Sequence, residues 1–210
     1  MASPFAADRI EIRPATADRW EDLRVILGPK DLDTPSCWCL SMRVSQADPR
    51  LKGALKGDRS ELARKRIAVS KELCAGAIPP GVLAYVDGEV AGWCSVSPRS
   101  AYDRLAKSRV IPHVDDAPVW SVVCFVVRAG YRRQGLAGAL LDGAVDFARS
   151  HGATVVEGYP ADVGGEKIDV ASAYIGTRSL FERHGFAWAS DTAAVGGGKP
   201  RVLMRRALDA

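Results

Sequence analysis

The segment from Val119 to Val127, VWSVVCFVV, constrains the fold more than any other stretch of this chain. It is an almost unbroken run of β-branched and aromatic residues, which is typical of a central strand covered on both faces. After a short turn, apolar residues recur at helical spacing from Leu136 to His151, and Thr154 to Tyr159 reads as a second buried strand. This order of strand, helix and strand predicts a parallel pair in the middle of a sheet.

The segments on either side predict further strands and helices. Asp87-Gly88 lies between two β-prone runs, which is a strong signal for a tight hairpin. Apolar spacing and turn residues predict the remaining elements. We expect strands at Ile10 to Thr16, Val82 to Val86, Val90 to Val96, Ala187 to Ala193 and Arg201 to Leu208, helices at Ala17 to Leu27, Asp58 to Cys74, Ser100 to Arg109 and Ala171 to His184, and a long irregular connection from Leu32 to Gly57.

Length and composition indicate one ordinary globular domain, residues 1–210 with a core of about residues 10–208. Hydrophobic residues make up 47% and charged residues 26%, and the first residues lack a basic start followed by a long apolar stretch. We therefore expect a cytoplasmic protein without a membrane partner. The net charge of +4 is spread along the chain, which argues against a nucleic-acid-binding protein.

The five cysteines are scattered and odd in number, so reduced thiols are expected in place of a disulfide framework. Cys37 and Cys39 form a close pair, but a structural zinc site needs four ligands and the three histidines supply no matching second pair. The sequence thus predicts no metal site.

A basic, glycine-containing turn joins the central strand to the helix that follows it. The first turn of a helix carries amide groups without internal partners and a partial positive charge, so it can bind an anion such as a diphosphate. Small residues leave those amides accessible, and arginines add charge. The alternative is a basic turn whose small residues only pack the helix on the sheet. The segment comprises Arg132, Arg133, Gln134, Gly135, Leu136, Ala137 and Gly138.

A buried strand, a turn and then Arg-x-x-Gly-x-Ala opening a helix resembles the acyl-CoA signature of the GNAT superfamily of N-acetyltransferases. The order of elements over nearly the whole chain is similar too, including the late helix that ends FERHGF. The resemblance implies an α/β (α+β) fold: a mixed, mainly antiparallel sheet of about seven strands with a central parallel pair, flanked by helices. It also implies acetyl-CoA as cosubstrate. The pantetheine arm would pair with the backbone of Phe125, Val126 and Val127, and amides from about Arg133 to Gly138 would hold the diphosphate.

Acyl transfer to an amine needs a base, because an ammonium group has no lone pair. Glu157 is the candidate, since an acid within an apolar strand beside the cleft is costly to bury unless it is paired. The alternative is a structural carboxylate paired with an arginine or an amide. The tyrosine that often protonates the departing thiolate in this superfamily is replaced by Phe181, which cannot donate a proton. Other conceivable donors are Tyr174, Tyr159, Thr177 and Cys124.

The resemblance places the amine acceptor near the loop from Asp33 to Arg43, the region of His113 and the terminal hairpin, with Trp38 and Trp93 as walls. The acceptor's identity stays open, and a homodimer is one assembly the chain could form. A covalent acyl-enzyme on Cys124 is disfavoured because its surroundings are apolar and no histidine partner is evident. The main alternative to an enzyme is a GNAT-like module that binds or senses acyl-CoA without catalysis.

Overall fold

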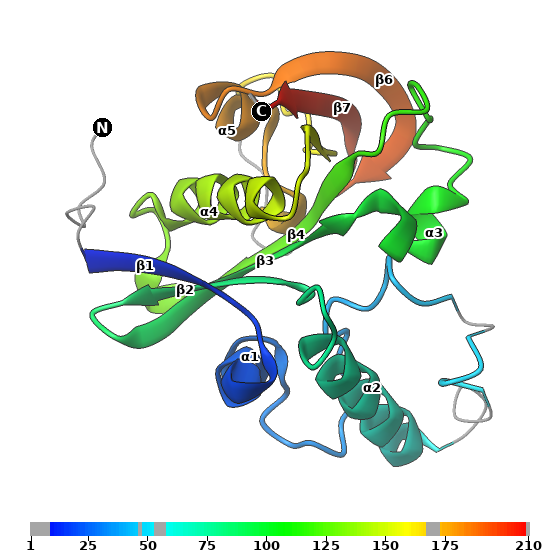
Figure 1. Cartoon of the computed structure of the whole chain (residues 1–210), viewed down its shortest axis with the longest axis vertical. Helices are drawn as coiled ribbons and strands as arrows, with labels where there is room; N and C mark the ends of the chain where they lie inside the picture. The colour runs from blue at the N-terminus through cyan, green and yellow to red at the C-terminus, as the bar shows by residue number, and fades with distance from the viewer. Residues whose placement is uncertain (1–8, 46–47, 53–57, 167–172, 209–210) are drawn as a thin grey trace.

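A computed structural model describes residues 9–45, 48–52, 58–166 and 173–208 (Figure 1). Its centre is a seven-stranded sheet in the order β1-β2-β3-β4-β5-β7-β6. Adjacent strands run antiparallel except β4 and β5, which are parallel, as the sequence predicted. The strands are β1 (Ile10–Pro14), β2 (Gly81–Val86), β3 (Glu89–Pro98), β4 (Trp120–Val127), β5 (Val155–Gly158), β6 (Ala187–Gly196) and β7 (Lys199–Ala207).

Helices cover both faces of the sheet (Figure 1). On one face α4 (Leu136–Ser150) packs Leu136 and Leu140 into a core with Val122 and Phe125 of β4. On the other face α1 (Trp20–Leu27) and α2 (Arg59–Cys74) enclose a second core. Two short helices, α3 (Asp103–Ala106) and α5 (Arg178–Arg183), and the 3-10 turns η2 (Ala17–Arg19), η4 (Arg99–Ala101), η5 (Ala129–Tyr131) and η6 (Ala173–Ile175) complete the described elements. None of the helices in these ranges is both long enough and apolar enough to cross a membrane.

Local sequence chemistry accounts for several element ends. Asp58 caps α2, because its side chain accepts a hydrogen bond from the Glu61 N–H at 3.0 Å. Asp87 and Gly88 both adopt positive φ, 51° and 82°, which is the geometry of the tight hairpin predicted between β2 and β3. Gly135 adopts φ 84° immediately before α4, a left-handed conformation that glycine reaches without steric cost.

The helix predicted from Ala171 to His184 is wrong as a single element. Its first two residues lie outside the described ranges, and the rest is η6, a break, and the six-residue α5. Gly176 at the break has φ 74°, and the Thr177 side chain accepts from the Leu180 N–H to cap α5. A left-handed residue cannot continue a right-handed helix, and apolar spacing does not reveal it. Tyr174 and Phe181 therefore lie on separate elements, on either side of this break.

Candidate functional site

The parallel strands β4 and β5 separate soon after they meet. Their pairing runs from Trp120 opposite Val156 to Val122 opposite Gly158 and then stops. On its other side β4 keeps pairing with β3 as far as Val127. Within the described residues no strand pairs with the second half of β4 on the β5 side, so β4 presents an open edge there.

The pairing with β3 decides which backbone groups reach the open edge. The Arg128 N–H donates to Ala91 O at 3.0 Å, so Arg128 is directed at β3. Because successive residues of a strand alternate in direction, Val126 is also directed at β3, whereas Phe125 and Val127 face the open edge. Arg132 Nε donates to Val127 O at 3.0 Å. Of the three residues predicted to pair with the pantetheine arm, Phe125 and Val127 direct their backbone groups to the open edge, whereas Val126 directs its groups to β3.

The open edge leads through η5 to the first turn of α4. The N–H groups of Gly138 and Ala139 both donate to the Gly135 carbonyl, at 2.9 and 3.2 Å. The N–H groups of Leu136 and Ala137 make no hydrogen bond within the described ranges, as is general for the first residues of a helix. These two amides therefore have no acceptor and can donate to an anion, whereas the amide of Gly138 already donates to Gly135.

Glu157 lies in a buried polar cluster on the face of the sheet away from α4. Its side chain is 0% exposed and pairs with two arginines: Arg99 Nη1 donates to Oε1 at 2.6 Å, and Arg205 Nε donates to Oε2 at 3.0 Å. The hydroxyls of Ser121 and Tyr159 donate to Oε1 as well. This is the arginine-paired carboxylate that the sequence left open as the alternative to a base. Sequence reasoning missed both arginines, which are far from Glu157 in the chain and carry no local signal.

The residues considered as proton donors are dispersed. Phe181 is fully buried, with its ring against Phe125 and against Gly158, where a Cβ would lie 2.2 Å from it. Tyr174 is 44% exposed on η6, and Thr177 caps α5. Burial and the adjacent Glu157 charge raise the pKa of the Tyr159 hydroxyl well above its usual value, so this hydroxyl holds its proton firmly.

Cys124 faces the side of the sheet expected to receive the acceptor, where it meets Cys39. Their sulfur atoms lie 3.1 Å apart, and Trp93 Nε1 donates to Cys39 Sγ at 3.1 Å. The hydrogen bond with Cys124 and burial raise the pKa of the Cys39 thiol well above its usual value. Trp93 and Trp38 are 1% and 3% exposed, and Trp38 stacks on Trp20, so the expectation that they wall an open acceptor site is wrong.

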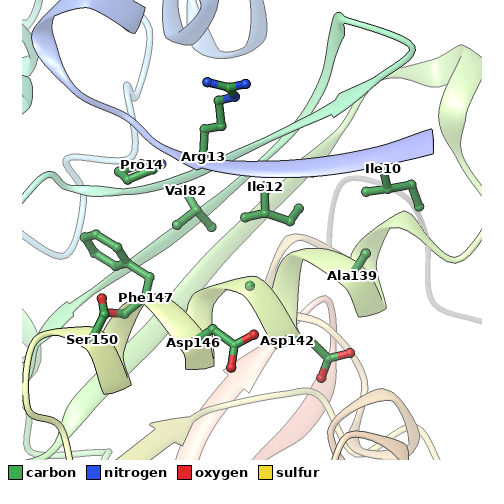
Figure 2. A pocket seen from close by; sticks show the side chains of 11 residues that line it. Ile10, Ile12, Arg13, Pro14, Val82, Ala139, Asp142, Asp146, Phe147 and Ser150 are labelled. Carbon is green, nitrogen blue, oxygen red and sulfur yellow. The ribbon is translucent and has the colours of Figure 1, made fainter. Parts of the chain in front are cut away.

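Two pockets lie away from this open edge. Figure 2 shows a groove between β1 and α4, whose lining includes the apolar Ile12 and Phe147 and the acidic Asp142 and Asp146. The other pocket lies where β4 begins and includes Arg99 and Arg205. Neither includes a residue of the candidate cofactor segment. In the described residues no group of three or more histidine, cysteine, aspartate or glutamate side chains is placed to hold a metal ion.

In this mixed sheet the central parallel strands separate beside the start of a helix, so that an unpaired strand edge lies next to helix amides. This arrangement defines a class of α/β proteins. The family model described as the acetyltransferase (GNAT) family matches residues 58–186, well over half of the chain. The chain belongs to this family. No curated protein gives a significant sequence match.

Solved structures share the fold at low sequence identity. An acetyltransferase is 16% identical, with 95% of this chain and 100% of that chain covered and a TM-score of 0.55. The yncA protein from Salmonella typhimurium, a putative acetyltransferase with its cofactor acetyl-CoA, is 17% identical over 96% of this chain and 95% of that chain, with a TM-score of 0.50. A chain of the NatC complex bound to Gag peptide and CoA is 13% identical over 96% and 99%, with a TM-score of 0.50.

Proposed function

We propose that this protein is an acyl-CoA-dependent N-acetyltransferase that uses acetyl-CoA as cosubstrate and transfers the acetyl group to a primary amine by direct attack. The observation that carries the proposal is the open edge of β4, which leads straight into the first turn of α4. Family membership and the binding of acetyl-CoA by the yncA protein support it. A homodimer is the assembly we consider for this protein.

The proposed cofactor site joins two kinds of backbone groups. The amides of the pantetheine arm would pair with Phe125 and Val127 along the open edge, as an added strand does. The diphosphate would accept hydrogen bonds from the N–H groups of Leu136 and Ala137, with the helix dipole contributing partial positive charge. The exposed Arg133 would add charge at the same turn.

In the proposed reaction the neutral amine forms the new N–C bond, the C–S bond breaks, and the sulfur leaves as a thiolate that takes up a proton. Alignment of amine and thioester supplies much of the rate in such a direct transfer. Glu157 was the predicted base, but two guanidinium groups occupy both of its carboxylate oxygens. This geometry favours a positioning role over proton abstraction, and the stability and pH-rate profile of Glu157→Gln distinguish the two roles.

The second candidate function is a module that binds acyl-CoA without catalysis. Two observations favour it: the phenyl ring of Phe181 provides no hydroxyl near the opening, and the carboxylate of Glu157 is fully paired. An active enzyme without that hydroxyl would leave thiolate protonation to water. The two candidates share the cofactor site and differ only in turnover.

Calorimetric titration with CoA tests the shared site. Gly135→Leu places a side chain at a left-handed position in front of the free helix amides and should abolish binding. Gly130→Leu is the matched control, because a Cβ at Gly130 meets nothing within 4 Å, and it should bind normally. Thermal melting of both variants separates lost folding from a lost site. Normal binding by a folded Gly135→Leu protein would contradict the proposal.

A screen of amines with acetyl-CoA, read out as free thiol, then separates enzyme from module. Thiol release with at least one amine supports the transferase and identifies the class of acceptor. Tight CoA binding without thiol release above the rate of hydrolysis for any amine would favour the module.

A further inference from the structure

His184, at the end of α5, packs its imidazole ring against the first turn of α4. A Cβ added to Gly138 would lie 2.6 Å from His184 Nε2 and 2.7 Å from Cε1, so the ring occupies the space that a side chain at Gly138 would fill. The Cα–Cβ bonds of a helix tilt toward its N-terminus, and a side chain covers the turn before its own Cα. The edge of the ring that carries Nε2 therefore lies against Gly138, within the first turn of α4.

The orientation of this ring is fixed from its other side. His184 Nδ1 lies 2.9 Å from Asp142 Oδ1, one turn further along α4. Figure 2 shows the Asp142 carboxylate projecting from α4 away from the apolar side chains of β1. Arg206 of β7 donates to the His184 carbonyl at 2.9 Å and lies 3.8 Å from Asp142. His184 Nε2 has no hydrogen-bond partner in the described ranges and is not among their buried unpaired polar atoms, so it reaches solvent.

We propose that His184 is a phosphate-binding residue of the cofactor site, with Nε2–H donating to the diphosphate of CoA while Asp142 holds Nδ1–H. Both ring nitrogens then carry protons, so the bound form is the imidazolium. The inference rests on the proposed function, which supplies the diphosphate. The charged groups around the ring are Asp142 from α4, Arg206 from β7, and Glu182 and Arg183 of α5 itself.

The consequence is a proton taken up on binding. Because the imidazolium is the form that binds, affinity should fall as the pH rises through the range in which histidine loses its proton. CoA also carries a terminal phosphate that titrates near pH 6, which would mask the effect. Dephospho-CoA lacks that group and keeps the diphosphate, so it is the probe to use.

The experiment titrates dephospho-CoA into the protein at about pH 6 and about pH 8 in buffers of different ionisation enthalpy. Wild-type protein should bind up to about tenfold more weakly at the higher pH, the change expected for a shift of one pKa unit, and should take up a fraction of a proton. His184→Gln should bind with the same weaker affinity at both pH values. His151→Gln, which changes an exposed histidine at the other end of α4, should behave as wild type.

A second variant tests the role of Asp142 without altering the ring. Asp142→Asn removes the counter-ion, so the fall in affinity should move to lower pH, which a purely structural contact would not produce. Equal pH dependence in wild type and His184→Gln, or an unmoved profile in Asp142→Asn, would overturn this inference and leave the cofactor site standing. Failure of wild-type protein to bind either CoA or dephospho-CoA would instead overturn the proposed function, and this inference with it.

Discussion

Gly138→Ala, made in the wild-type protein and in His184→Ala, tests why residue 138 is glycine. From the sequence, Gly138 keeps the surface of the helix bare for a phosphate. In the structure its N–H is bonded within α4, and the His184 ring fills the place of a side chain. We therefore expect the imidazole to be what excludes a larger residue.

The size of the effect follows from two opposing contributions. Alanine is favoured over glycine within a helix by about 1 kcal/mol, less near the end of the helix. An added methyl 2.6 Å from His184 Nε2 forces the ring or the helix to move, and overpacking of this kind costs about 1 to 3 kcal/mol. Gly138→Ala should thus be neutral to destabilising by about 2 kcal/mol in wild type, and stabilising by up to about 1 kcal/mol in His184→Ala.

Urea unfolding of the four proteins measures this coupling, provided that the m-values agree. An interaction energy of about 1 to 3 kcal/mol between the two positions is expected, which is typical of residues in contact. Effects that add within about 0.5 kcal/mol would refute the reasoning, because they would show that the His184 ring does not require glycine at position 138. Calorimetry of the Gly138→Ala protein with CoA then shows whether displacing the ring also weakens cofactor binding.

Three further predictions concern other contacts of the described chain. Glu157→Gln should lower the free energy of unfolding by about 3 to 5 kcal/mol, because the buried Arg99 loses its counter-ion and Arg205 keeps only Asp115; unchanged stability with a lost acidic limb in the pH-rate profile would instead identify a base. Asp58→Ala should cost about 1 kcal/mol in urea unfolding and Asp58→Asn much less, because the amide oxygen still caps α2. At about pH 8 the exposed Cys37 should react rapidly with an aromatic disulfide, whereas Cys74, with its pKa raised to about 11 by burial, should react only on unfolding; equal rates would contradict this burial.

The parts of the fold that could be predicted are those that short-range chemistry determines. Asp87-Gly88 predicts its own hairpin because few other residue pairs adopt two positive φ angles in succession. The run from Val119 to Val127 predicts a central strand because it is apolar at nearly every position, and such a strand must be covered on both faces. Parallel pairing with β5 then follows from the helix between them.

The parts that could not be predicted depend on residues far apart in the chain. Nothing around Glu157 indicates that Arg99 and Arg205 converge on it, since the pairing requires η4, β5 and β7 to be placed first. The break at Gly176 was missed because apolar spacing continues across it. The role of His184 was missed for the same reason as the arginines, because its partner Gly138 lies on another helix.

The buried cluster around Glu157 also explains where β4 and β5 separate. Glu157 is paired with Ser121 across the two strands, one residue before the last pair, Val122 with Gly158. A buried carboxylate held by two arginines is strongly penalised if either partner is lost, so the strands are held together at this register. β5 ends at Gly158, and the next residue of the chain, Tyr159, turns its hydroxyl back to Glu157. Along β4 the ion-pair cluster comes before the last pair with β5, and the open edge at Phe125 and Val127 comes after it. The cluster therefore determines where the open edge begins.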